Sequence, residues 1–124
     1  MLLDTNIIIY ACKSGGDWLS TWTEDPSAAI ASVSRVEALG YHRITSAEDA
    51  ALRRFFSANP SYPLDDEVIE RAIALRKQKN MGLADALIAA TALEYDLPLV
   101  TRNTDDFERI GGLRIINPFA APSP

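Results

Sequence analysis

The sequence predicts an α/β fold, with a mainly parallel β-sheet flanked by helices on both faces. Short apolar segments typical of buried strands alternate along the chain with longer segments that have the apolar periodicity of helices. Strands separated by helices form parallel sheets with helices packed against each face. The 124 residues are enough for one domain with a core of its own. We therefore expect a single domain at residues 1–117, followed by a C-terminal tail at residues 118–124.

Four segments are predicted to contribute strands to this sheet. The apolar, β-branched segment Leu2–Ile9 is interrupted at Asp4, so we expect a strand that ends near Asp4 and continues into a helix. The other three predicted strands are Ala28–Val33, Leu97–Thr101 and Leu113–Ile116.

Four helices are predicted between the second and third strands: Arg35–Tyr41, Ala47–Phe56, Asp66–Lys79 and Ala84–Tyr95. The third of these has acidic residues in its first turn and basic residues in its last turn, which matches the helix dipole. The segment Asn59–Pro63 is expected to be a turn that joins two helices.

Composition indicates a globular cytoplasmic protein that does not associate with a membrane. Hydrophobic residues make up 48% of the chain and charged residues 23%, which is ordinary for a globular protein. The first thirteen residues are apolar, but they contain Asp4 and Asn6, lack a basic leader and are too short to span a bilayer. Cys12 is the only cysteine, so it cannot form an internal disulfide and is expected to pack as a small hydrophobic residue.

The net charge of -5 is unusual for a protein that binds nucleic acid, because phosphate contacts are made mainly by lysine and arginine. Acidic residues that bind divalent cations are an exception to this argument. They count as negative in the formal charge, yet together with their metal ions they present a positive centre to a phosphate.

Four acidic residues are embedded in apolar sequence at a strand end or a helix start: Asp4, Glu37, Asp85 and Asp106. Ligands of open parallel sheets bind beyond the carboxyl ends of the strands, where these positions would converge. Carboxylates that lie a few ångströms apart raise one another's pKa, and bound divalent cations are the usual compensation. The four acids together therefore indicate a metal site.

Each of these acids also has a purely structural explanation. Ser34 and Glu37 have the spacing of a capping box, and Asn103 and Asp106 could begin a short helix in the same way. The other two acids could cap a helix or complement its dipole. For any one acid alone this explanation is favoured, but it does not account for all four at once.

Other polar residues point to no alternative chemistry. His42 is the only histidine, which argues against a histidine-centred triad or a zinc site. The sequence has no nucleophile-elbow motif and no glycine-rich phosphate loop. Trp18 and Trp22 are expected to belong to the core or to a protein interface rather than to stack on bases.

Four segments of the chain, taken in order, resemble the PIN-domain family, and within it the VapC toxins of type II toxin–antitoxin pairs. They are Leu-Leu-Asp-Thr-Asn at residues 2–6, Ser-Val-Ser-Arg-Val-Glu-Ala-Leu at 32–39, Leu-Ala-Asp-Ala-Leu-Ile-Ala-Ala-Thr-Ala-Leu at 83–93, and Leu-Val-Thr-Arg-Asn-Thr-Asp-Asp-Phe-Glu-Arg-Ile at 99–110. Each motif is weak alone, but the ordered set covers the chain from Met1 to about Asn117.

The resemblance implies a PIN-like nuclease domain that binds Mg²⁺ or Mn²⁺ through its acidic residues. The implied metal ligands and catalytic residues are Asp4, Glu37, Asp85 and Asp106, with Asp105 as the alternative to Asp106. The implied hydrogen-bonding residues around them are Thr5, Asn6, Thr101 and Asn103.

The function implied by the resemblance is metal-dependent hydrolysis of RNA by a toxin that inhibits translation. Its implied partners are the RNA substrate, a cognate antitoxin and a second copy of the chain. Arg35 and Arg102 are candidate substrate contacts because they lie next to the motifs. The alternative is a catalytically silent PIN-like module that binds RNA or protein. A phosphatase with Asp4 as nucleophile is less well supported, because no second acid follows two residues later.

Overall fold

The structure is a computed structural model that describes residues 1–120. The strands are β1 (Leu2–Leu3), β2 (Ile30–Ala31), β3 (Ser61–Tyr62), β4 (Leu99–Val100) and β5 (Ile115–Ile116). The helices are α1 (Thr5–Ala11), η1 (Asp17–Leu19), α2 (Ser20–Thr23), α3 (Ser32–Leu39), α4 (Ser46–Ala58), α5 (Asp66–Gln78), α6 (Leu83–Glu94) and α7 (Thr104–Phe107).

All strand pairs in the described residues are parallel. One sheet has the order β1-β4-β5, in which Leu2 pairs with Leu99 and Leu99 with Ile115. The second sheet pairs β2 with β3, and a parallel bridge between Leu2 and Ala29 joins it to β1. The strands therefore form one continuous parallel layer in the order β3-β2-β1-β4-β5.

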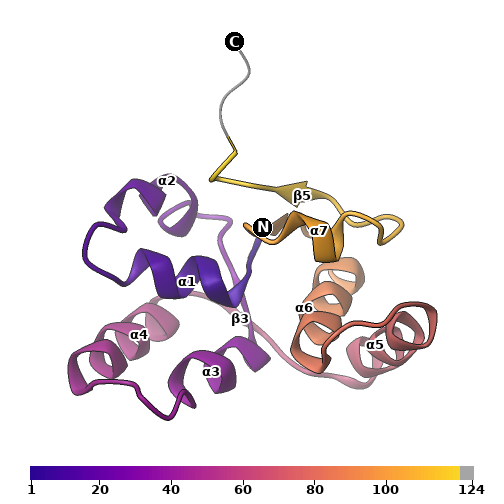
Figure 1. Cartoon of the computed structure of the whole chain (residues 1–124), viewed down its shortest axis with the longest axis horizontal. Coiled ribbons are helices and arrows are strands. Elements are labelled where there is room, and N and C mark those ends of the chain that lie inside the picture. Colours follow the sequence, from indigo (N-terminus) through magenta and orange to yellow (C-terminus); the bar gives the residue numbers. More distant parts are fainter. Residues whose placement is uncertain (121–124) are drawn as a thin grey trace.

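Successive strand residues face opposite sides of this layer, and helices cover both sides (Figure 1). Leu2 and Leu99 pack in a core cluster with residues of α5 and α6. Leu3 and Val100 pack in a second cluster with residues of α1, α3 and α4. This arrangement confirms the predicted α/β fold. It also places the starts of α1, α3 and α7 just after the carboxyl ends of β1, β2 and β4.

Helix α6 packs closely against its neighbours because its inward positions carry small side chains. Ala86, Ala89 and Ala90 are fully buried, and the helix contacts both α5 and α3. Close packing of this kind fixes the position of the first turn of α6, which contains Asp85.

Two sequence-based expectations about local structure are wrong. Asn59–Pro63 is not only a turn, because its residues 61–62 form β3, which pairs with β2. Helix α3 begins at Ser32, within the segment expected to be the second strand, so Ser34 lies inside the helix rather than at its N-cap. The capping-box explanation of Glu37 is therefore also wrong: the N-cap is Ala31, without a side-chain hydrogen bond.

The aromatic residues near the N-terminus form a small cluster outside the main core. Trp22 is partly buried against the cluster around Leu3, whereas Trp18 remains 48% exposed. Trp18 packs edge-on against Phe119, at the start of the expected tail, with ring centroids 4.8 Å apart. The rest of that tail, residues 121–124, lies outside the described residues. Within residues 1–120, no helix has the length and apolar character needed to cross a membrane.

Candidate functional site

The four candidate acids are carried by four different elements at the carboxyl edge of the parallel layer. Asp4 directly follows β1 and is the N-cap of α1, and Glu37 lies in α3. Asp85 lies in the first turn of α6, and Asp106 in the short helix α7 that follows β4. The fold therefore brings together residues that are far apart in the sequence.

Asp4 is the innermost of these acids, with only 4% of its surface exposed. Its Oδ1 accepts a hydrogen bond from the Thr5 backbone N–H at 2.8 Å, and its Oδ2 accepts one from the Thr101 hydroxyl at 2.7 Å. Burial raises the pKa of Asp4, while these hydrogen bonds act in the opposite direction. Asp4 is thus held in one orientation by its neighbours.

Thr5 connects Asp4 to Glu37. The Thr5 hydroxyl donates to Glu37 Oε1 at 2.6 Å, and the Thr5 hydroxyl oxygen also lies 2.8 Å from the Ser34 hydroxyl. Thr5 and Ser34 are buried, so these contacts lie beneath the surface that carries Glu37. The first turn of α1 therefore fixes the side chain of Glu37 beside that of Asp4.

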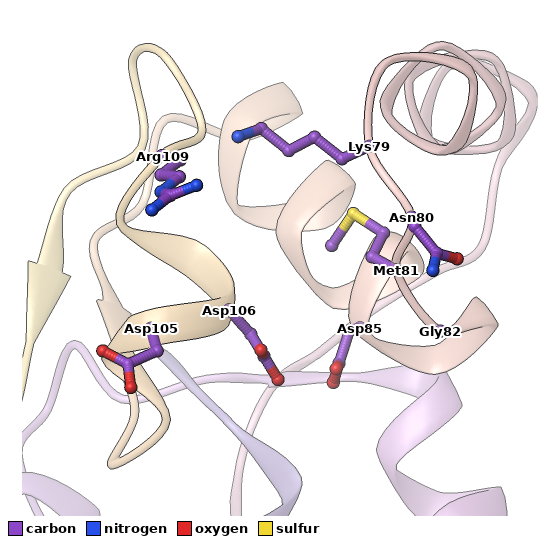
Figure 2. Close-up of a pocket in the computed structure, with 8 residues that line it drawn as sticks. All are labelled: Lys79, Asn80, Met81, Gly82, Asp85, Asp105, Asp106 and Arg109. Atoms are coloured by element: carbon purple, nitrogen blue, oxygen red, sulfur yellow. The ribbon is translucent and has the colours of Figure 1, made fainter.

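Asp85 experiences the combined charge of the other acids. Its pKa is raised from 3.8 to about 6, first by burial and then by the negative charges of Asp4, Asp106 and Glu37. In Figure 2 the side chains of Asp85 and Asp106, from α6 and α7, both extend toward the bottom of the view, where their carboxylates lie next to each other. The acids therefore lie close enough to repel one another, as the sequence predicts.

Asp106, rather than Asp105, faces the other acids. The side chain of Asp105 points away from Asp85 in Figure 2, and its charge is not among the causes of the raised pKa of Asp85. Asn103, the N-cap of α7, donates from Nδ2 to Asp106 Oδ2 instead of capping the helix. This contact orients Asp106.

Three of the four residues expected to support the acids make the expected kind of contact. Thr5 and Thr101 both hydrogen-bond to Asp4, and Thr101 also accepts from the Asn103 backbone N–H at 3.0 Å. Asn6 differs, because it is exposed and no hydrogen bond in residues 1–120 joins its side chain to an acid.

A hollow of about 380 Å³ opens beside the outer acids (Figure 2). Its lining residues are Lys79, Asn80, Met81, Gly82, Asp85, Asp105, Asp106 and Arg109. The buried Asp4 is not part of this lining. The lysine and the arginine were not identified from the sequence, although both stand in loops next to the acid motifs, one between α5 and α6 and one after α7.

The two basic residues that the sequence did suggest lie in other hollows. Arg102 lines a hollow with Asn6, Tyr10 and Asn103, which adjoins the acids through the contact between Asn103 and Asp106. Arg35 lines a separate hollow that contains none of the four acids. The structure therefore favours Arg102 over Arg35 as a residue near the site.

The donor set fits a hard divalent cation such as Mg²⁺ or Mn²⁺, because it consists of carboxylate oxygens whose mutual repulsion a cation would relieve. In the part of the chain that the structure describes, no three acidic, histidine or cysteine side chains are already arranged as ligands of one ion. A cation would therefore have to bring the carboxylates of the partly buried Asp85 and the exposed Asp106 closer to the inner pair.

Comparison with known proteins shows which class of protein this fold and acidic site define. The family model of the PIN domain matches residues 1–113. The chain belongs to the PIN domain family.

Two relatives are similar over nearly their whole length. Ribonuclease VapC10 of Mycobacterium tuberculosis is 32% identical over 130 residues, covering 98% of this chain and 95% of the relative. Ribonuclease VapC of Rickettsia bellii is 29% identical over 128 residues, covering 94% of each chain.

Solved structures share the fold. A toxin-antitoxin complex from Klebsiella pneumoniae contains a chain with a TM-score of 0.76 and 31% identity, covering 97% of this chain and 98% of that one. The chain in VapBC2 from Rickettsia felis, solved bound to a promoter DNA fragment, has a TM-score of 0.80 and 24% identity, covering 94% and 96%.

Proposed function

We propose that this protein is an endoribonuclease that hydrolyses RNA with Mg²⁺ or Mn²⁺ and acts as the toxin of a VapBC-type pair. The observation that carries the proposal is the convergence of Asp4, Glu37, Asp85 and Asp106 at one edge of the sheet. Relatives named ribonuclease VapC support RNA as the substrate, and the toxin-antitoxin complex from Klebsiella pneumoniae supports an antitoxin as partner.

Each acid has a distinct part in this proposal. Asp4, held by Thr5 and Thr101, provides a fixed anionic anchor at the base of the site. Asp85 and Asp106 line the hollow, where a cation could reach their carboxylates. When bound, a divalent cation supplies Lewis-acid chemistry, polarising the phosphoryl group and lowering the pKa of an attacking water.

The net charge of -5 is compatible with this function, because a large part of the negative charge lies where cations bind. The competing proposal is a catalytically silent module that binds RNA or protein. A silent module has no use for four mutually repelling carboxylates, since such repulsion costs folding stability. The presence of all four acids in one cluster therefore favours the enzyme.

The decisive experiment compares RNA cleavage by the wild type and by Asp85→Asn with Mg²⁺, with Mn²⁺ and with EDTA. We expect cleavage by the wild type only when a divalent cation is present, and a loss of orders of magnitude in Asp85→Asn. Asp66→Asn is the matched control, because Asp66 also lies in the first turn of a helix but does not line the hollow.

The control variant should cleave RNA like the wild type. Equal cleavage by all three proteins in EDTA would contradict the proposed metal site and point to a contaminating nuclease. Binding of RNA without any cleavage would establish the silent module instead.

The proposed partners are a cognate antitoxin and a second copy of the chain. Several large apolar side chains are exposed and available for such contacts, among them Val36 at 73%, Leu83 at 60% and Tyr41 at 53% exposure. Light scattering of the purified protein and co-purification with the product of the neighbouring reading frame test the two partners separately. A strictly monomeric protein that recovers no such product would contradict both.

A further inference from the structure

Two basic side chains enter the hollow that contains the outer acids. Lys79 comes from the loop between α5 and α6, and Arg109 from the loop that follows α7. In Figure 2 both lie on the side of the hollow away from the carboxylates of Asp85 and Asp106, and Lys79 extends toward the side of Arg109. Neither forms a salt bridge in residues 1–120. The hollow thus has an acidic end and a basic end.

The backbone at Lys79 is anchored to the end of α5. Lys79 is the C-cap of α5, its N–H donates to the Leu75 carbonyl at 3.0 Å, and the residue is partly buried. Arg76 donates to the Met81 carbonyl at 3.3 Å, which ties the loop back to α5. The Lys79 side chain therefore starts from a defined position.

Arg109 is anchored by its neighbours in the chain. It is exposed, but it stands between Phe107, which is fully buried, and Ile110, which is 4% exposed and donates to the Phe107 carbonyl at 3.1 Å. The two buried side chains fix the turn that presents the guanidinium group to the hollow.

Two positive charges that share a hollow repel each other, and nearby carboxylates would ordinarily pair with them. Other arginines of this chain do so, as Arg71 with Glu94 and Arg53 with Asp49 show. Lys79 and Arg109 instead remain without a carboxylate partner in the described residues, although Asp85 and Asp106 line the same hollow. The arrangement is suited to an external anion that lies between them.

We propose that Lys79 and Arg109 bind a phosphate group of single-stranded RNA next to the phosphate that is cleaved. The inference rests on the proposed function for the identity of the anion. A nucleic acid strand carries phosphates at regular intervals, so a chain whose one phosphate lies at the acidic end places a neighbouring phosphate farther along the hollow. Lysine offers a point charge and arginine a bidentate fork to such a group.

A simpler explanation is that the two cations only reduce the repulsion among the acids. That explanation predicts a loss of stability when either charge is removed, but no change in the number of phosphate contacts. The number of contacts can be measured, because each contact adds about 0.7 to the slope of log affinity against log salt concentration for a single strand. Salt dependence therefore separates the two explanations.

The experiment measures binding of a fluorescent, unstructured single-stranded RNA by anisotropy over a series of salt concentrations with Mg²⁺ present. All proteins carry Asp85→Asn, so that the RNA is expected to stay intact during the measurement. Lys79→Gln and Arg109→Gln should each lower affinity about 3- to 10-fold at low salt and reduce the slope by about 0.7. Lys77→Gln is the control, since Lys77 is an exposed residue of the same helix end that does not line the hollow.

Variants that keep the positive charge distinguish loss of a phosphate contact from misfolding. Lys79→Arg and Arg109→Lys should keep the slope of the parent, and thermal melts should show all variants folded. If Lys79→Gln and Arg109→Gln keep the slope of the Lys77→Gln control, the inference is wrong. It is also wrong if these variants lose affinity for the antitoxin protein but not for RNA. Shortening of the RNA by the Asp85→Asn parent would contradict the proposed metal site instead.

Discussion

The inner and outer parts of the acid cluster differ in how their carboxylates are satisfied. Asp4, at the inner part, is buried and accepts hydrogen bonds at both oxygens from Thr5 and Thr101. Asp85 and Asp106, at the outer part, line an open hollow, and Asn103 is the only side chain in the described residues that hydrogen-bonds to either. The inner part is integrated into the fold, while the outer part remains exposed to ligands.

This difference means that the inner part contributes mainly to stability and the outer part mainly to cation binding. A buried carboxylate with satisfied oxygens tolerates its burial because the hydrogen bonds offset much of the desolvation cost. Outer carboxylates that repel each other oppose folding, and only a bound cation or a proton relieves them. Substitutions of the inner residues should therefore reduce stability, whereas substitutions of the outer acids should abolish activity without loss of stability.

The largest effect is expected from the pair of adjacent acids in α7. Asp106→Asn should reduce RNA cleavage by more than about 100-fold, because the carboxylate that faces Asp85 would no longer bind the cation. Asp105→Asn should change cleavage less than about threefold, in keeping with the small effects of surface charges. Initial rates at saturating Mg²⁺ measure both variants. Equal losses of cleavage in the two variants would mean that cleavage does not depend on Asp106, rather than Asp105, facing Asp85.

The second effect concerns the stability of the inner part. Thr101→Val removes the donor to Asp4 Oδ2 and the acceptor of the Asn103 N–H, so both groups lose a partner near the core. We expect the free energy of unfolding to fall by about 1 to 3 kcal/mol, measured by urea denaturation. Thr91→Val is the control, since its hydroxyl bonds only to a carbonyl within α6.

The control should cost less than about 1 kcal/mol, because the Leu87 carbonyl keeps its place in the helix. A Thr101→Val protein as stable as the control would show that the hydrogen bonds to Asp4 contribute little. The distinction between an inner and an outer part of the cluster would then lose its basis.

The sequence was informative about the acids because parallel topology dictates where strand ends converge. Asp4 and Asp106 follow β1 and β4, which are neighbours in the sheet although they are about a hundred positions apart in the chain. Periodicity indicated α5 and α6 within one residue of their observed ends, as their amphipathic or alanine-rich patterns are long. These features follow from local pattern and from general rules of connection.

Features that depend on tertiary contacts were not predictable in this way. Strand β3 has only two residues, Ser61 and Tyr62, and neither its length nor its polarity indicates a strand until β2 pairs with it. Ser34 fits a capping box by spacing, but the chain enters α3 two residues earlier. The position of Lys79 opposite Arg109 depends on how α5, α6 and α7 pack, which no spacing in the sequence encodes.

The third and smallest effect is a gain of stability in the outer part. The pKa of Asp85 is raised to about 6 in the folded protein, mainly by burial and then by the charge of Asp4, so the folded state binds a proton more tightly than the unfolded state does. The free energy of unfolding therefore falls as pH rises from about 4 to about 6, and the deficit persists at neutral pH. Asp85→Asn removes the ionisable group and should remove this deficit.

In metal-free buffer at pH 7, Asp85→Asn should be more stable than the wild type by about 1 kcal/mol, a value reduced for solvent screening because Asp85 is only partly buried. The difference between the two proteins should shrink toward zero as pH falls below about 4, where both side chains are neutral. Asp66→Asn should instead lose about 0.3 to 1 kcal/mol, because it removes a charge that favours the start of α5. Thermal melts in EDTA at several pH values measure all three proteins. A loss of stability in Asp85→Asn at pH 7 would show that Asp85 acts as an ordinary helix-start acid, and that the repulsion between the outer carboxylates does not oppose folding.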